Sequence, residues 1–120
     1  MKRLDFEKTF LEAVDTALLS LGESPRQAVY YHLNKSFKLQ REEIPDDADE
    51  FSQALNVIFG PGAEVIEKII VKHLYSSLNL NYEEKSCFEF VDYISSARES
   101  VKREKQQLKI GRKLRMEKPT

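Results

Sequence analysis

The amino-acid sequence predicts an all-α protein, a compact bundle of about five helices with a projecting basic C-terminal helix. Apolar residues recur three and four positions apart in almost every segment, which is the period of an amphipathic helix. No segment shows the strict alternation of apolar and polar residues that is typical of a half-buried strand. The length of 120 residues suits one domain. We expect residues 1–100 to form the bundle and residues 101–120 to form a basic helical extension or a frayed tail.

The first two helices are predicted by their apolar faces and by the residues at their ends. A helix from about Asp5 to Leu21 is followed by Gly22, which suits a left-handed stop. A second helix is expected at Ser24, whose hydroxyl can cap free amides, with Pro25 at the first helical position and Gln27 completing a capping box. The expected inward residues are Phe6, Phe10, Val14, Ala17, Leu18 and Leu21 in the first helix and Val29, Tyr30, Leu33 and Phe37 in the second.

The third helix is expected between two chain breaks. Ile44 precedes Pro45, and a residue before proline is disfavoured in helical geometry. Asp46 and Asp47 are then candidate caps for the helix. The segment 60–62, Gly-Pro-Gly, supplies a glycine to end this helix and a proline to start the next. The expected inward residues of the third helix are Phe51, Ala54, Leu55, Ile58 and Phe59.

The fourth helix, to about Leu78, is apolar over a wide arc, so we expect it at the centre of the bundle. Residues 79–81 break the chain, and a fifth helix is predicted from about Tyr82 to beyond Val101. The expected inward residues are Val65, Ile66, Ile69, Ile70 and Leu74 in the fourth helix and Phe90, Val91, Ile94, Ala97 and Val101 in the fifth. We expect the core to include Phe10, Phe59, Ile66, Ile69 and Ile70.

Charge divides the chain into an acidic body and a basic end. Residues 1–97 hold ten Lys or Arg against seventeen Asp or Glu, a net charge of −7. Residues 98–120, which we call the basic segment, hold nine against three, a net charge of +6, so the chain as a whole carries −1. This asymmetry indicates interaction with an acidic partner.

Five cations of the basic segment recur at steps of four, three, four and three, so a continued helix would place them along one side. We call these residues the basic face: Arg98, Lys102, Lys105, Lys109 and Arg112. A regular cationic face can bind phosphates, with an affinity that falls as salt is added. The alternative is a solvated tail, or one that folds onto the acidic body of a neighbour. Few aromatic residues accompany the charges, so base stacking is poorly supported.

A second pattern crosses the same region at seven-residue steps. It joins Cys87, Ile94, Val101, Leu108 and Arg115. The positions that would complete a coiled-coil seam are basic, and a parallel self-pair would bring these like charges together. The pattern therefore predicts an edge that meets its own core or a partner.

Other candidate sites are weaker. One is an acidic cluster that could suggest a cation site: Glu42, Glu43, Asp46, Asp47, Asp49 and Glu50. It lacks the alternating ligands and the glycine of a calcium loop. Carboxylates at a helix N-terminus are also stabilised by the helix dipole, so they need no metal. His32 and His73 lie outside any zinc spacing, and Cys87 has no histidine near it in sequence. We expect no metal, no cofactor and no catalytic residues.

Composition also bears on location. No apolar run approaches the length of a bilayer span, and the N-terminal residues lack the apolar region of a signal peptide. The single cysteine cannot form an internal disulfide. We expect a cytoplasmic protein with no membrane partner.

Several short stretches resemble a known family. These are residues 21–30 (Leu-Gly-Glu-Ser-Pro-Arg-Gln-Ala-Val-Tyr), residues 42–45 (Glu-Glu-Ile-Pro), Phe51 and residues 58–63 (Ile-Phe-Gly-Pro-Gly-Ala). Over roughly residues 18–78 the chain resembles a small archaeal signalling output domain of the Nitrosopumilus output-domain type. The resemblance implies an all-helical, cytoplasmic domain linked to signal transduction, and it supplies no catalytic residues.

The function expected from the sequence is binding. The leading hypothesis is a non-enzymatic helical output or adaptor domain that binds a protein partner in archaeal signal transduction. The alternative is a small nucleic-acid-associated protein that uses the basic C-terminal helix. An enzyme is third, because no acid–base or nucleophile pattern is present. A homo-oligomer stays open.

Overall fold

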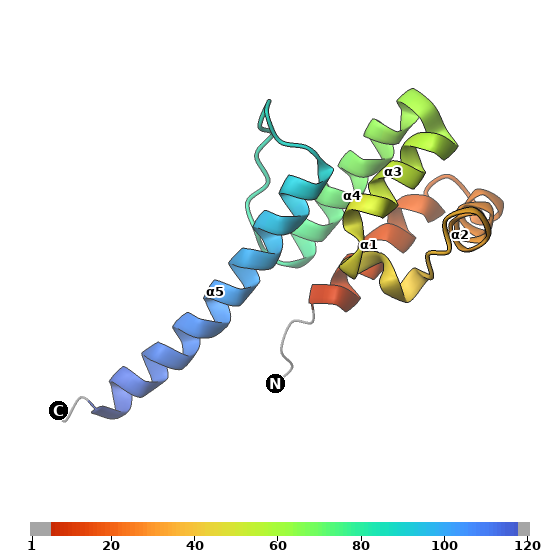
Figure 1. The fold of residues 1–120 in the computed structure, drawn as a ribbon. Coiled ribbons are helices and arrows are strands. Elements are labelled where there is room, and N and C mark those ends of the chain that lie inside the picture. The colour runs from red at the N-terminus through yellow and green to blue at the C-terminus, as the bar shows by residue number, and fades with distance from the viewer. Residues whose placement is uncertain (1–5, 118–120) are drawn as a thin grey trace.

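The computed structural model describes the backbone of residues 6–117 and the side chains of residues 6–103. Over this range the chain is all-α and contains no strand, which confirms the predicted fold class (Figure 1). The elements are α1 (Phe6–Leu19), α2 (Glu23–Phe37), the 3₁₀-helix η1 (Arg41–Asp46), α3 (Ala48–Phe59), the 3₁₀-helix η2 (Gly60–Gly62), α4 (Ala63–Ser77) and α5 (Phe90–Glu117).

The fourth helix is central, as predicted. Helix α4 packs against α1, α3 and α5, while α1 also contacts α2 and η1. The first turns of α5 lie against this body and the rest of the helix extends away from it (Figure 1). The molecule is accordingly elongated, with extents of 59 × 29 × 22 Å.

A line of phenylalanine rings joins three helices through the core. Phe10 of α1 contacts Phe90 of α5 at 6.2 Å between ring centroids, and Phe90 contacts Phe51 of α3 at 6.1 Å. Tilted ring pairs at such distances add about 0.5–1.5 kcal/mol each to the gain from burial. Phe10 and Phe51 are fully buried. The start of α5 is therefore part of the core.

Most of the predicted core residues are buried. Phe10, Ile66 and Ile70 lie in the core, and Phe59 and Ile69 are partly buried against it. The prediction was wrong for two residues. Val65 is 61% exposed and Leu21 is 41% exposed. Leu21 lies after the last residue of α1, so it no longer follows the helical face on which the sequence pattern placed it.

Helix α2 starts two residues earlier than predicted, at Glu23, and uses a different cap. Its N-cap is Gly22, and no side-chain hydrogen bond caps it, so the predicted Ser24 capping box is absent. Glu23 instead accepts hydrogen bonds from Arg26 (2.7 Å) and Gln27 (3.0 Å) within the first turn. The missing amide of the proline at position 25 costs little, because the first amides of a helix have no helical acceptor.

The polar stretch after α2 folds into η1 where a chain break was expected. A capping box that was not predicted forms here, between Gln40 and Glu43. Ile44 and Pro45 are both buried within this 3₁₀-helix. Asp47 occupies the N-cap position of α3, but its side chain makes no capping hydrogen bond, so the predicted carboxylate cap is not formed.

The Gly-Pro-Gly joint between α3 and α4 works as predicted. Gly60 ends α3 with φ 60° and ψ −135°, a conformation that residues with a side chain rarely adopt. The following proline lies in the first turn of η2 and leads directly into α4. The joint therefore sets the antiparallel packing of α3 on α4.

Gly60→Ala is expected to lower the free energy of unfolding by roughly 1–3 kcal/mol, because alanine would be strained at this positive φ. Steric clash does not contribute, since no atom lies within 4 Å of a Cβ built on Gly60. Gly62→Ala is the matched control, because Gly62 has an ordinary φ of −71°. Urea denaturation of both variants measures the difference, and equal losses would contradict this explanation.

The segment between α4 and α5 differs most from the prediction. The fifth helix was expected from about Tyr82, but residues 79–89 form a loop. Asn79 adopts a positive φ of 61° just after α4 ends. The Tyr93 hydroxyl accepts a hydrogen bond from the Lys85 amide at 2.7 Å, and the rings of Tyr82 and Tyr93 lie 5.6 Å apart. Tertiary packing of these aromatic residues holds the loop in place of a helix.

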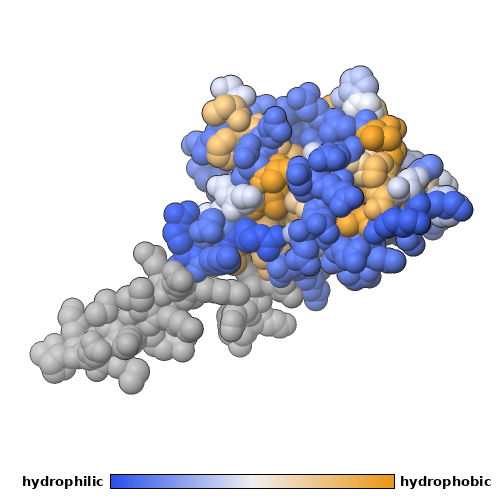
Figure 2. Space-filling view, viewed as in Figure 1, coloured by the Kyte–Doolittle hydropathy of each residue, from blue (hydrophilic) through white to orange (hydrophobic). Residues whose placement is uncertain are grey.

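The surface of the body is mainly polar. Figure 2 shows charged and polar side chains over most of the visible face, with separate hydrophobic patches among them. Within the described residues, no helix combines the length and the apolar character that a bilayer span requires.

Candidate interaction site

Arg98, the first residue of the predicted basic face, is used within the fold. Its guanidinium contacts Glu7 of α1 at 3.1 Å and donates a hydrogen bond to the Pro45 carbonyl of η1 at 2.6 Å. It also lies over the Phe6 ring, 4.5 Å from the centroid. Arg98 thus joins α5 to α1 and η1, and it fixes the direction in which the helix leaves the body.

The remaining basic residues follow this joint. Val101 is the last residue of the described side chains that is buried, at 6% exposure. Lys102 and Arg103 are exposed directly after it. Three predicted residues lie in α5 beyond the side chains that the structure describes: Lys105, Lys109 and Arg112. Of the basic face, the described side chains therefore comprise Arg98, which is packed against the body, and Lys102, which is exposed.

The seven-residue pattern is interrupted at its first position. Cys87 lies in the loop before α5 and is exposed, so it is not part of the helix. Ile94 and Val101 are buried in the bundle. These two residues meet the chain's own core, which is one of the two outcomes predicted for this edge.

A cleft that sequence patterns did not reveal lies between α3, α4 and the 79–89 loop. It has a volume of about 810 Å³ and reaches the start of α5. Asn56, Glu64 and Glu67 line it from the helices, and Tyr82 and Phe88 line it from the loop. Its residues are distant in sequence, so only the fold brings them together.

Glu67 is a half-buried carboxyl group of this cleft. Partial burial raises its pKa, a hydrogen bond from Ser52 Oγ at 2.6 Å lowers it, and the negative charges of Glu64 and Glu89 raise it again. The net effect is a pKa above the ordinary value. The cleft therefore favours a positive charge near these three carboxylates.

Aromatic rings in and beside the cleft already hold ammonium groups of the chain itself. Lys85 Nζ lies 4.8 Å from the Phe88 ring centroid, and Lys72 Nζ lies 5.9 Å from that of Tyr82. Lysine and arginine bind aromatic faces in this way with about 0.5–1 kcal/mol at exposed sites. The region thus combines carboxylates and rings, both of which suit cations.

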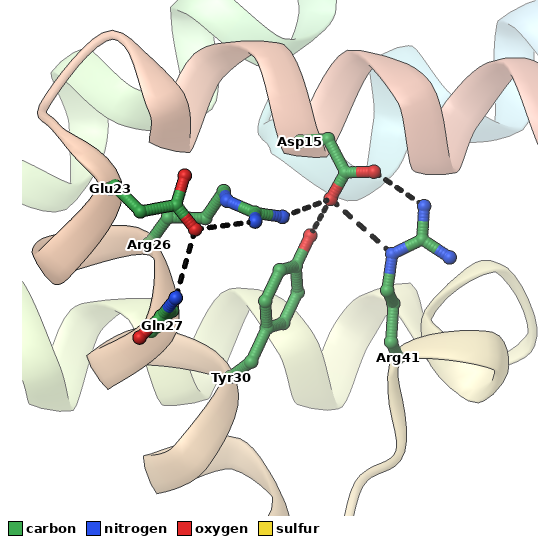
Figure 3. A network of polar contacts seen from close by, with 6 residues as sticks. All are labelled: Asp15, Glu23, Arg26, Gln27, Tyr30 and Arg41. Atoms are coloured by element: carbon green, nitrogen blue, oxygen red, sulfur yellow. Dashed lines mark hydrogen bonds and ion pairs between the residues drawn. The ribbon is translucent and has the colours of Figure 1, made fainter.

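A second polar cluster joins α1, α2 and η1 around Asp15 (Figure 3). Asp15 accepts hydrogen bonds from the Tyr30 hydroxyl and from Arg41, whose Nη2 lies 2.5 Å away. Arg26 lies 3.7 Å from the same carboxylate. Partial burial alone would raise the pKa of Asp15, but hydrogen bonds from Arg41 and Tyr30 and the two guanidinium charges outweigh it and lower the pKa. The cluster holds three elements together.

Asp15→Asn is expected to lower the free energy of unfolding by about 1–3 kcal/mol at neutral pH, because it removes a charged acceptor shared by Tyr30 and Arg41. Since the pKa of Asp15 is lowered by folding, this stability is present above the ordinary carboxyl value of 3.8 and is lost as pH falls through the folded-state pKa. Urea denaturation at about pH 7 and about pH 2.5 measures both effects.

Glu12→Gln is the control for Asp15→Asn, because Glu12 is an exposed acidic residue of the same helix. We expect its substitution to change stability by less than about 0.5 kcal/mol at either pH. An Asp15→Asn loss that stays the same from neutral to acidic pH would show that the Asp15 charge contributes nothing.

The described residues show no assembled metal or nucleophile site. His32 and His73 are exposed on α2 and α4, and Cys87 is exposed in the loop. No three His, Cys, Asp or Glu residues in the described part of the chain are placed to hold a metal ion. In the acidic cluster, Glu43 takes part in the capping box of η1.

Comparison with known proteins gives one informative match. The fold is similar to the crystal structure of PH0832 from Pyrococcus horikoshii OT3, with a TM-score of 0.66 and 19% sequence identity over 79% of this chain and 96% of that protein. At this identity the similarity concerns the fold alone. No protein family matches the chain, and no curated protein sequence matches it.

Proposed function

We propose that the chain is a non-enzymatic helical output or adaptor domain that binds an acidic protein partner through the basic segment on α5. One observation carries this proposal. A segment with a net charge of +6 continues the helix that leaves a body with a net charge of −7. Such a separation favours and steers contact with acidic surfaces.

The structure of the joint supports this role. Phe90, Ile94 and Val101 anchor α5 in the core, and Arg98 binds Glu7 and the Pro45 carbonyl. The helix is thus held firmly at its base while Lys102 and Arg103 are exposed beyond it. A rigid base reduces the ordering cost when the basic segment binds.

A place in archaeal, cytoplasmic signal transduction is also part of the proposal. It rests on the resemblance of residues 18–78 to the Nitrosopumilus output-domain type. The motifs behind that resemblance have structural roles here. Gly22 is the N-cap of α2, and the Gly-Pro-Gly segment joins α3 to α4. They support the fold of an output domain more strongly than any particular signal.

The proposal is tested by crosslinking and purification from native cells, comparing the wild-type chain with the triple variant Lys105→Glu, Lys109→Glu and Arg112→Glu. We expect acidic proteins to co-purify with the wild-type chain, to survive nuclease treatment and to be lost from the variant. The matched control reverses three lysines of the body and changes the net charge equally: Lys35→Glu, Lys38→Glu and Lys72→Glu. Loss of the same proteins from the control, or their retention by the triple variant, would contradict the proposal.

The second candidate function is association with nucleic acid. It is favoured by the regular spacing of the basic face and by the exposure of Lys102. The basic segment contains no aromatic residue that could stack on a base. If only nucleic acid co-purifies and is lost at moderate salt, this function replaces the first. Each lost phosphate contact would then reduce the salt slope by about 0.9 on duplex DNA.

A further inference from the structure

The cleft beside the start of α5 has an excess of negative charge. Four glutamates and two lysines line it. One lysine is already neutralised, since Lys68 Nζ lies 2.6 Å from Glu84. The other lysine, Lys85, lies over the Phe88 ring. Three carboxylates remain near one another, those of Glu64, Glu67 and Glu89.

The charge on Glu67 has no cationic partner among the groups that shift its pKa. Burial, Glu64 and Glu89 all raise this pKa, and only the Ser52 hydroxyl opposes them. A positive group entering the cleft would reverse this balance. The volume of about 810 Å³ lies within the range of about 300–1,000 Å³ that ligand sites occupy.

The chain carries cations that could fill this cleft, but its own basic segment cannot reach it. Helix α5 is continuous from Phe90 to Glu117. At about 1.5 Å per residue, Lys102, the first exposed residue of the basic face, lies about 20 Å along the helix from Glu89, and Arg112 lies about 35 Å from it. A cation of the basic segment that entered this cleft would therefore belong to another molecule.

The order of charges along α5 indicates which molecule this is. Glu89 and Asp92 lie at the start of the helix, and the basic segment lies at its other end. Two α5 helices side by side in parallel would place like charges together. An antiparallel pair places the basic segment of each chain beside the start of α5, and so beside the cleft, of the other.

We propose that this cleft receives Lys109 and Arg112 of a second copy of the chain, in a two-fold symmetric dimer with antiparallel α5 helices. The contact is made twice, once in each direction, as two-fold symmetry requires. This inference rests on the proposed function and names its acidic partner. Glu64, Glu67 and Glu89 are the acceptors.

Analytical ultracentrifugation of the full chain over a concentration series tests the dimer. We expect the wild-type chain to dimerise. We expect the triple variant Glu64→Gln, Glu67→Gln and Glu89→Gln to dimerise at least roughly tenfold more weakly, since it removes the charged acceptors from both contacts of the dimer. The control removes three exposed acidic residues outside the cleft: Glu12→Gln, Glu42→Gln and Asp46→Asn. Equal weakening in the control would overturn the proposal.

A charge swap makes the test specific to these surfaces. A chain with Glu64→Lys and Glu89→Lys should be monomeric, and so should a chain with Lys105→Glu, Lys109→Glu and Arg112→Glu. Mixing them should restore a dimer, because the reversed cleft of one now meets the reversed segment of the other. Circular dichroism confirms that each chain is folded. Two folded chains that stay monomeric after mixing would overturn the proposal.

This experiment separates the dimer from the proposed function. The dimer is overturned if the wild-type chain is monomeric at all concentrations. The proposed function still stands in that case if the variant Lys105→Glu, Lys109→Glu and Arg112→Glu no longer co-purifies with an acidic protein that the wild-type chain binds. If the same variant self-associates and co-purifies with acidic proteins as the wild-type chain does, both the dimer and the proposed function are overturned.

Discussion

Ile70→Ala is expected to lower the free energy of unfolding by roughly 2–5 kcal/mol. Ile70 lies on α4, the helix that packs against α1, α3 and α5, and its side chain is fully buried. Truncation removes buried methyl and methylene groups and leaves a cavity that three packed helices can fill only in part. Urea or thermal denaturation followed by circular dichroism measures the loss.

The same helix offers a matched control. Val65 lies one and a half turns earlier on α4 and is 61% exposed, so Val65→Ala is expected to change stability by no more than about 0.5 kcal/mol. A loss below about 1 kcal/mol at Ile70 would show that α4 is not the centre of the bundle. A large loss at Val65 would indicate that its exposed face is covered by another molecule.

Ending the chain at Arg103 is expected to leave the body folded and to remove most of its partner binding. Val101 is the last buried residue among the described side chains, so the shortened chain keeps its core contacts. It loses six of the nine basic residues of the basic segment and keeps Arg98, Lys102 and Arg103. Thermal unfolding should shift by only a few degrees, about 1 kcal/mol or less.

Unfolding of the shortened chain would contradict this prediction. It would show that residues 104–120 pack as part of the body and that their charge is incidental. A chain that folds and binds every partner as before would show that the basic face is only solvated. Circular dichroism and co-purification together separate these outcomes.

Periodicity predicted the helices well where burial on one face determines them. The inward residues of α3 show this, since Phe51, Ala54 and Leu55 are all buried. The Gly60–Gly62 joint was equally predictable, because glycine and proline restrict the backbone locally. These features depend on short stretches of sequence.

Features that depend on tertiary contacts could not be read from the sequence. Residues 82–88 have a composition that a helix would accept, yet Tyr82, Phe88 and Tyr93 pack together and hold a loop. The start of α2 was predicted too late in the sequence, because Gly22 and Ser24 are both acceptable N-cap residues and the choice between them depends on how α1 ends.

The candidate site was predictable only in its charge. The sequence placed Arg98 and Lys102 on one basic face, but Glu7, Pro45 and Phe6 bind Arg98 from positions distant along the chain. The cleft has no sequence signature either, since Ser52, Glu67 and Glu89 come together only through packing. Long-range contacts decide which charges are available to a partner.

The role of the basic segment is tested most directly by the affinity of the co-purified partner for the full chain and for the chain ending at Arg103. Isothermal titration calorimetry at about 50 mM and about 200 mM salt gives both affinities and their salt dependence. We expect the full chain to bind more weakly as salt rises, and the shortened chain to bind at least roughly tenfold more weakly at low salt, a difference of about 1.4 kcal/mol. Equal affinity and equal salt dependence for the two chains would contradict the proposed function.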